Sequence, residues 1–293
     1  MMKSRHIRER LASGLRVRDF TFIDLFAGIG GFHYGLSQCG GRCVMASEID
    51  PIAADSYERN LGLKPLGDIY KIDSKDIPEF DLLCAGFPCQ TFSNVGQKGG
   101  LDDPRGQLIF EVIRILKDKQ PKAFILENVK GLQSINKGAI LKMIVEKLDK
   151  TGYDVKYQIL EAKDYGVPQI RKRLFIVGTR KDLKIEFEFP QKIGCEKKLS
   201  EILGGEVDRE YGFTVRIGGR HSGINNKFNW DCYLVDGKPK YIRPEECLEL
   251  QGFPRDYYLA GNTDAKYRQV GNSVPTTVVR EIGLALLSTG IFD

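Results

Sequence analysis

Long apolar runs and a secretion signal are both missing from this 293-residue sequence. No apolar stretch approaches the roughly 20 residues that a membrane-spanning helix needs. The basic N-terminus lacks the apolar core of a signal peptide. The sequence therefore predicts neither a membrane protein nor a secreted one.

Cysteine pairs are also missing. The cysteines stand at 39, 43, 84, 89, 195, 232 and 247, and no CxxC pair occurs among them. An odd number without paired spacing is typical neither of a disulfide framework nor of a zinc site. We expect reduced thiols in a cytoplasmic protein that holds no metal.

Charge and composition place the chain among soluble globular proteins. The formal net charge of +5 is compatible with a polyanionic partner, although many enzymes without such a partner are as basic. One region interleaves cations with aromatic side chains, namely Tyr211, Phe213, Arg216, Arg220, His221, Lys227, Phe228 and Trp230. This mixture suits phosphates and bases, but a solvated loop explains the composition equally well.

Strand-like and helical segments alternate through the first half of the chain. Short apolar runs at 20–26, 42–47, 80–85 and 123–126 are typical of buried strands. Further strands are expected at 153–160 and 173–178, and one is expected to end at 67–69. The alternation predicts an α/β domain with a mostly parallel sheet.

The pattern changes near Lys181. From there to about Lys240 glycines are frequent and no helix is evident, which indicates a small β-rich or irregular lobe. The α/β character then returns, and Val274-Pro275 opens a last helix. We predict a catalytic domain over 1–182 and 244–293, with the lobe at 183–243.

A glycine-rich turn, AGIGG at 27–31, follows the first strand and precedes a helix. Such turns let the backbone approach a nucleotide-like cofactor closely. Glu48 ends the next strand 20 positions after Gly28, where an acidic residue can accept hydrogen bonds from a ribose. A surface glutamate is the alternative, and the spacing favours the cofactor. The dinucleotide fingerprint is incomplete because His33 stands at its last glycine position.

Cys89 lies in the turn GFPCQ at 86–90, directly after the strand at 80–85. Pro88 fixes its own φ and restricts the residue before it, so the thiol is held with little freedom. Glu127 follows the next strand. Because neighbouring strand ends lie ~5 Å apart, we expect the thiol and the carboxyl to face one pocket.

Eight motifs, in this order, resemble those of the DNA (cytosine-5) methyltransferases that use S-adenosylmethionine. They are FAGIGGF at 26–32, Glu48, GDI at 67–69, GFPCQ at 86–90, ENV at 127–129, QIRKR at 169–173, QGFP at 251–254 and GNSVP at 271–275. The resemblance covers nearly the whole chain. It implies a Rossmann-like α/β methyltransferase fold with a target-recognition lobe, a flipped-out target cytosine, and double-stranded DNA as the partner.

The resemblance also implies a role for each matching residue. Cys89 attacks C6 of the cytosine, protonated Glu127 holds N3, and Arg173 binds O2 with support from Arg171. The implied cofactor contacts are Phe26, Gly28, Ile29, Gly30, Gly31, Glu48, Ile49, Asp68, Ile69, Pro88, Leu108 and Asn272. The expected DNA contacts are Ser93, Arg105, Arg216 and Arg220. The loop at 94–105 is expected to close over the flipped base.

Three alternatives share parts of this pattern. A tRNA cytosine-5 methyltransferase has the same active site, but that branch looks different around the recognition region and after the cysteine turn. An NAD-dependent oxidoreductase accounts for the glycine turn and Glu48, yet gives no role to Cys89. A catalytically dead DNA-binding relative conflicts with the filled motif positions. The leading prediction is a monomeric bacterial or phage-type DNA methyltransferase, alone or paired with a separate restriction endonuclease.

Overall fold

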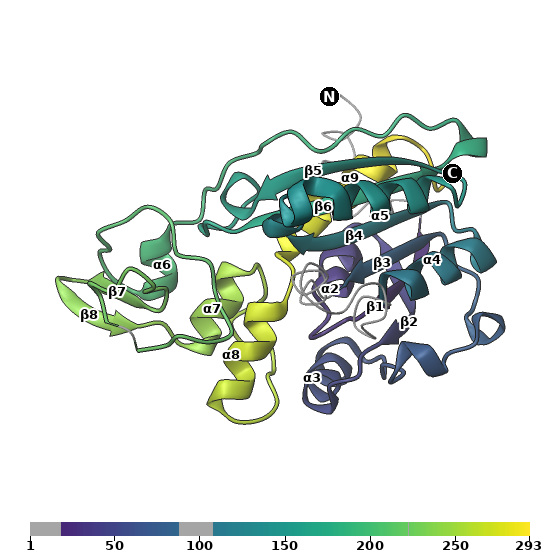
Figure 1. The fold of residues 1–293 in the computed structure, drawn as a ribbon. Helices are drawn as coiled ribbons and strands as arrows, with labels where there is room; N and C mark the ends of the chain where they lie inside the picture. Colours follow the sequence, from purple (N-terminus) through teal and green to yellow (C-terminus); the bar gives the residue numbers. More distant parts are fainter. Residues whose placement is uncertain (1–18, 88–107, 222) are drawn as a thin grey trace.

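The computed structural model describes residues 19–87, 108–221 and 223–293 (Figure 1). Six strands form one sheet in the order β2-β1-β3-β4-β6-β5. They are β1 (Phe20–Leu25), β2 (Gly41–Ser47), β3 (Leu82–Gly86), β4 (Ala123–Val129), β5 (Tyr153–Glu161) and β6 (Lys172–Arg180). β1 pairs in parallel with β2 and β3, and β3 pairs in parallel with β4. The predicted α/β class with a mostly parallel sheet is confirmed.

One strand of this sheet runs against its neighbours. β6 is antiparallel to both β4 and β5, and its register pairs Arg173 with Val129. The amino end of β6 therefore lies at the edge where β1 to β4 end. A parallel β6 would have carried Arg173 to the opposite edge, so this strand's direction brings the arginines of 171–173 to the site.

Helices cover both faces of the sheet (Figure 1). Side chains alternate along a strand, so Phe22 and Ile23 enter different core clusters. On the face of Phe22 lie α2 (Gly31–Ser37) and α9 (Thr276–Ser288). On the face of Ile23 lie α4 (Leu108–Lys119) and α5 (Ala139–Asp149). The result is a three-layer α/β domain whose strand ends are free to bind ligands.

The segment after β2 differs in part from the prediction. α3 (Pro51–Leu61) begins as its sequence indicates, because the Asp50 side chain accepts the Ile52 N–H at 2.9 Å. The strand expected to end at 67–69 is wrong. Pairing with β2 is limited to a single parallel bridge between Leu66 and Ser47, because the chain turns at Asp68, which caps a 3₁₀ turn at Ile69–Lys71 and accepts the Tyr70 N–H. The other 3₁₀ turns within the described ranges are Ser74–Asp76, Lys130–Gln133, Ile135–Gly138, Ala162–Asp164 and Lys181–Leu183.

A smaller part of the molecule lies beside the sheet domain (Figure 1). It contains α6 (Leu199–Leu203), the antiparallel hairpin of β7 (Cys232–Val235) and β8 (Lys238–Tyr241), α7 (Pro244–Leu250) and α8 (Thr263–Asn272). One buried cluster, called the lobe cluster below, joins α6, β7, α7 and α8, with Trp230, Leu248 and Val270 among its members. This cluster includes residues on both sides of the predicted boundary at 243, so α7 and α8 pack with the lobe. None of the helices in the described ranges is long and apolar enough to cross a membrane.

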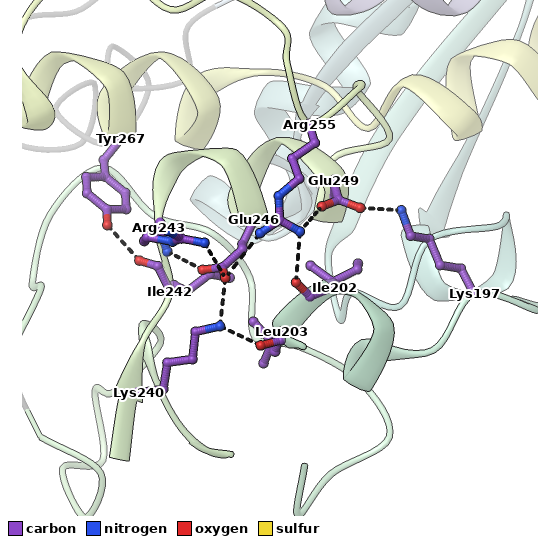
Figure 2. Close-up of polar contacts among 10 residues, drawn as sticks. All are labelled: Lys197, Ile202, Leu203, Lys240, Ile242, Arg243, Glu246, Glu249, Arg255 and Tyr267. Carbon is purple, nitrogen blue, oxygen red and sulfur yellow. Dashed lines mark hydrogen bonds and ion pairs between the residues drawn. The ribbon is translucent and has the colours of Figure 1, made fainter. Parts of the chain in front are cut away.

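Glu246 of α7 is a buried charge that meets several cations of this smaller part (Figure 2). Its side chain is 0% exposed, and its carboxylate accepts the Arg243 backbone N–H at 2.7 Å. Ion pairs reach it from Lys240 at 2.8 Å, Arg243 at 3.4 Å and Arg255 at 3.6 Å. A carboxylate is costly to bury unless it is paired. Glu246 therefore depends on contacts from β8, from the start of α7 and from the segment that follows α7.

Candidate active site

A cavity of about 670 Å³ opens at the edge where β1 to β4 end. Its volume is that of a typical small-molecule site. The wall includes the glycine turn, the ends of these strands and the 268–274 segment of α8 and beyond. Most described residues predicted to bind a cofactor line it, namely Phe26, Gly28, Gly31, Glu48, Ile49, Asp68, Ile69, Leu108 and Asn272.

Left-handed backbone shapes the turn after β1. Phe26, Gly28 and Gly30 have φ angles of 55°, 55° and 89°. Ile29 turns away from the cavity and packs in the lobe cluster, while its carbonyl accepts the Tyr257 hydroxyl at 2.6 Å. Ile29 and Gly30 are absent from the cavity wall. These two residues therefore shape the turn and join it to the lobe.

Glu48 holds this turn from the end of β2. One carboxylate oxygen accepts the Gly28 N–H at 2.7 Å, and the other accepts the Asp50 N–H at 2.7 Å. Burial raises the pKa of Glu48, and these two backbone hydrogen bonds partly oppose the increase. Because a carboxylate oxygen accepts more than one hydrogen bond, both oxygens keep capacity for a ligand. Beside it, Ile49 is 72% exposed and gives the cavity rim an apolar surface.

Glu127 lies at the end of β4, opposite Gly86 in the register of β3. Its carboxylate is 3.0 Å from Nε of Arg173, and both side chains are largely buried. Burial raises the pKa of Glu127, while the charges of Arg173 and Arg171 lower it in part. The carboxyl thus keeps its proton to a higher pH than an exposed glutamate does.

Asn128 fixes the start of the cysteine turn. Its buried side chain donates to the carbonyl of Phe87 at 2.8 Å, which ties the end of β4 to the residue after β3. Phe87 is the last described residue before 88–107. Pro88, Cys89, Ser93 and Arg105 lie outside the described residues. Glu127 and the point from which the Cys89 turn departs are therefore neighbours.

Arg171 lies directly before β6 and is 1% exposed. Its guanidinium donates to the carbonyls of Val215 at 3.0 Å, Gly271 at 2.9 Å and Ser273 at 2.7 Å. The guanidinium is thus engaged with backbone oxygens, whereas Arg173 points to the carboxyl of Glu127. The two arginines predicted to act together have different surroundings.

A family model described as C-5 cytosine-specific DNA methylase matches residues 20–222 and 214–288. The chain belongs to this family. The methylase is 40% identical to Type II methyltransferase M.DsaV of Dactylococcopsis salina, over 92% of this chain and 87% of the relative. It is 35% identical to M.HhaI of Haemophilus parahaemolyticus, over 94% of this chain and 95% of the relative. The predicted enzyme class, DNA (cytosine-5) methyltransferase, is confirmed, and an oxidoreductase is excluded.

Solved structures share the fold of this methylase. A putative DNA modification methyltransferase encoded within a prophage of E. coli superimposes with a TM-score of 0.73 at 23% identity, covering 92% of this chain and 99% of that one. A Spodoptera frugiperda DNMT2 mutant superimposes with a TM-score of 0.71 at 21% identity, covering 89% and 98%. The predicted Rossmann-like methyltransferase fold is thereby confirmed.

The two described residues of the methylase that were predicted to bind DNA differ in their surroundings. Arg216 is exposed. Arg220 forms an ion pair with Asp264 and lies 4.3 Å from the centre of the Tyr267 ring, so its charge is already engaged with α8. Trp230 donates to the Gly218 carbonyl at 2.8 Å and holds the segment between these arginines.

Sequence reasoning did not identify Arg268 as a site residue. This side chain on α8 lines the cavity of the methylase and lies 3.8 Å from Asp50, across the rim. The sequence offers no signal for it, because α8 reaches the cavity only through the packing of the lobe. Asn128 had a signal, since it follows Glu127 in the ENV motif.

Proposed function

We propose that this methylase transfers a methyl group from S-adenosylmethionine to C5 of a cytosine in a specific double-stranded DNA sequence. The ion pair of Glu127 and Arg173 carries the proposal, because it joins an acid and a cation at the edge of the cavity. The tie from Asn128 to Phe87 supports it, since the Cys89 turn departs from that point.

The residues of the cavity fit S-adenosylmethionine. Glu48 offers carboxylate oxygens to the ribose hydroxyls, and Asp68 offers an acceptor to the adenine amino group. The exposed side chain of Ile49 gives the ring an apolar surface. Phe26, Gly28, Gly31, Ile69, Pro88, Leu108 and Asn272 complete the binding site, and Ile29 and Gly30 hold its glycine turn. When bound, S-adenosylmethionine supplies the electrophilic methyl group.

The residues at the strand ends activate the cytosine. The Cys89 thiolate adds to C6, and the π electron pair of the C5=C6 bond shifts onto C5 and towards N3, which makes C5 nucleophilic. Protonated Glu127 donates to N3, and Arg173 donates to O2, so both stabilise the charge that develops there. Arg171 supports Arg173. C5 then takes the methyl group. A base removes the C5 proton as the thiolate leaves C6, and the N3 proton returns to the Glu127 carboxylate, which restores the ring and the acid.

The target base must leave the DNA stack to reach these groups. The lobe at 183–243 reads the sequence, with contacts from Arg216 and Arg220, while Ser93 and Arg105 contact DNA beside the base. The catalytic domain comprises 1–182 and 244–293. The enzyme acts as a monomer in the cytoplasm. The Type II names of its relatives support a cognate restriction endonuclease that acts separately.

Transfer of labelled methyl groups tests the proposal. The protein is incubated with methyl-labelled S-adenosylmethionine and either duplex DNA or tRNA, and methylated cytosines are mapped by sequencing. We expect label at C5 of cytosine in one short DNA sequence, and none with Cys89→Ala. Label in tRNA alone would contradict the proposed substrate, and label at another atom would contradict the proposed chemistry.

A further inference from the structure

Arg171 joins two segments that different ligands would touch. One segment is the cavity wall at Gly271 and Ser273, and the other begins at Val215 in the lobe. All three contacts are made by one guanidinium that is 1% exposed. Such a buried cation needs all of its acceptors, because an unpaired charge in the interior is strongly destabilising.

The first segment belongs to the cavity. Residues 271–274 line it, opposite the glycine turn. A Cβ atom on Gly31 would lie 2.7 Å from Oγ of Ser273 and 2.7 Å from Cγ2 of Val274, so this wall presses directly on the start of α2. A cofactor that fills the cavity would therefore restrict the motion of 271–274.

The second segment belongs to the lobe surface. Val215 is buried in the lobe cluster, whereas Arg216 is exposed and Ile217 is 51% exposed. The side-chain oxygen of Gln169 accepts the Val215 N–H at 3.1 Å, which fixes the start of the segment. DNA bound by the lobe would contact the exposed residues that follow.

The two segments also touch each other without an intervening side chain. A Cβ atom on Gly271 would lie 2.9 Å from the carbonyl carbon of Arg216 and 3.0 Å from its oxygen. Glycine is thus required at 271 by a close backbone approach. A displacement of either segment must be felt by the other, because packed interiors leave no free volume to absorb it.

We propose that Arg171 is a positioning residue that couples cofactor binding to DNA binding by holding these two segments together. A cofactor that orders 271–274 also orders 215–217, so DNA has less ordering to supply when it binds. The coupling is reciprocal, since DNA must raise cofactor affinity by the same factor. This inference rests on the proposed function, because it requires that the lobe binds DNA.

The test measures the coupling factor, which is the ratio by which one bound ligand changes the dissociation constant of the other. The dissociation constant of a duplex that carries the mapped site is measured with and without saturating S-adenosylhomocysteine, and that of S-adenosylhomocysteine with and without the duplex. For the wild type we expect each ligand to tighten the other by about 10-fold or more. Arg171→Lys keeps the charge but loses the fork that reaches several carbonyls, so its factor falls towards one.

A second variant disturbs the contact between the two segments without changing Arg171. Gly271→Ala leaves Arg171 in place but sets a methyl group against the Arg216 backbone, and its factor also falls towards one. Two controls keep the wild-type factor. Arg180→Lys changes the arginine at the far end of β6, which also donates to a carbonyl, that of Gln120 at 2.6 Å. Gly131→Ala adds a methyl group whose nearest neighbour lies 3.9 Å away.

The outcomes separate this inference from the proposed function. Weaker binding of both ligands with an unchanged factor would make Arg171 a purely structural residue and overturn the inference. If neither ligand changes the affinity of the wild type for the other, the inference is overturned as well. Provided that the wild type binds both DNA and the cofactor product in that experiment, the proposed function still stands. A wild type that binds S-adenosylhomocysteine but no DNA would overturn both. Thermal unfolding checks that each variant folds. If Arg171→Lys does not fold, the coupling factor of Gly271→Ala decides the test.

Discussion

Arg173 and Glu127 meet 3.0 Å apart because β6 runs antiparallel to β4 and begins where β4 ends. Burial raises the pKa of Glu127, and the nearby guanidinium only partly opposes this effect. In the proposed reaction a cytosine would contact both side chains, with its N3 at the Glu127 carboxyl and its O2 at the Arg173 guanidinium. In this account the ion pair holds the two proposed catalytic groups in place until the base arrives.

Glu127→Gln should lower kcat by about 100-fold or more, because an amide cannot give a proton to N3. In the wild type the protonated carboxyl is the active form, so the rate should fall as pH rises through its raised pKa. The variant should lack this alkaline decrease. Rates of methyl transfer at saturating DNA between pH 6 and 9 measure both effects. An alkaline limb unchanged in the variant would argue against a proton from Glu127.

Glu48→Gln should weaken S-adenosylhomocysteine binding by about 10-fold or more, because the amide nitrogen would face a backbone N–H. In the wild type the carboxylate is the binding form, and burial raises its pKa. Affinity should therefore decline as pH falls, starting at a higher pH than for an exposed glutamate. Calorimetric titrations across pH should show this decline in the wild type and a flat profile in the variant. If the affinity of both proteins fell equally as the pH was lowered, the decline would belong to another titrating group.

Arg268→Gln should speed the release of S-adenosylhomocysteine, because it removes an ion pair that crosses the rim of the cavity. The increase should be at most about 5-fold at low salt, since an exposed ion pair contributes little. The side chain lies 3.8 Å from Asp50 across the cavity rim. The difference from the wild type should shrink at high ionic strength, where exposed charges are screened. Stopped-flow release measures it, with Arg59→Gln as the control, because Arg59 pairs with Asp55 on α3 outside the cavity. If both variants changed the release rate equally, the position of Arg268 at the cavity rim would have no specific effect on release.

Glu246→Ala should destabilise the protein by about 1–3 kcal/mol, because the Arg243 N–H at the start of α7 loses its acceptor and partly exposed cations lose a partner. Chemical or thermal unfolding measures the change. Asp55→Ala is the control, since it removes an exposed ion pair with Arg59 and should leave the midpoint nearly unchanged. Similar losses for the two variants would mean that Glu246 does not hold the lobe.

The sheet domain was largely predictable because its signals are local. Short apolar runs, the glycine turn and the Asp50-Pro51 helix start each depend on a few adjacent residues. The strand expected to end at 67–69 is reduced to a single bridge at Leu66, because Asp68 caps a 3₁₀ turn that leads the chain away from β2. No local pattern shows whether a strand runs parallel or antiparallel, so the direction of β6 required the structure.

The candidate site was predictable where a motif carries it. Glu48 and Glu127 follow strands, and the sheet brings them to one edge. The burial of Arg171 and the approach of Arg268 to the cavity depend on how the lobe packs, which joins residues about 100 positions apart. The orientation of Ile29 has the same origin, since its partner Tyr257 lies in the lobe cluster. Contacts of this kind leave no periodic signal in a sequence.

The central claim is that Cys89 attacks the cytosine ring. Mass spectrometry tests it most directly, on protein incubated with S-adenosylmethionine and a duplex whose mapped target base is 5-fluorocytosine. Fluorine cannot leave C5 as a proton does, so the covalent intermediate should accumulate. We predict a wild-type adduct that maps to the Cys89 peptide, and none with Cys89→Ala. A wild type that binds cofactor and DNA yet forms no adduct, or an adduct that persists in Cys89→Ala, would contradict the account.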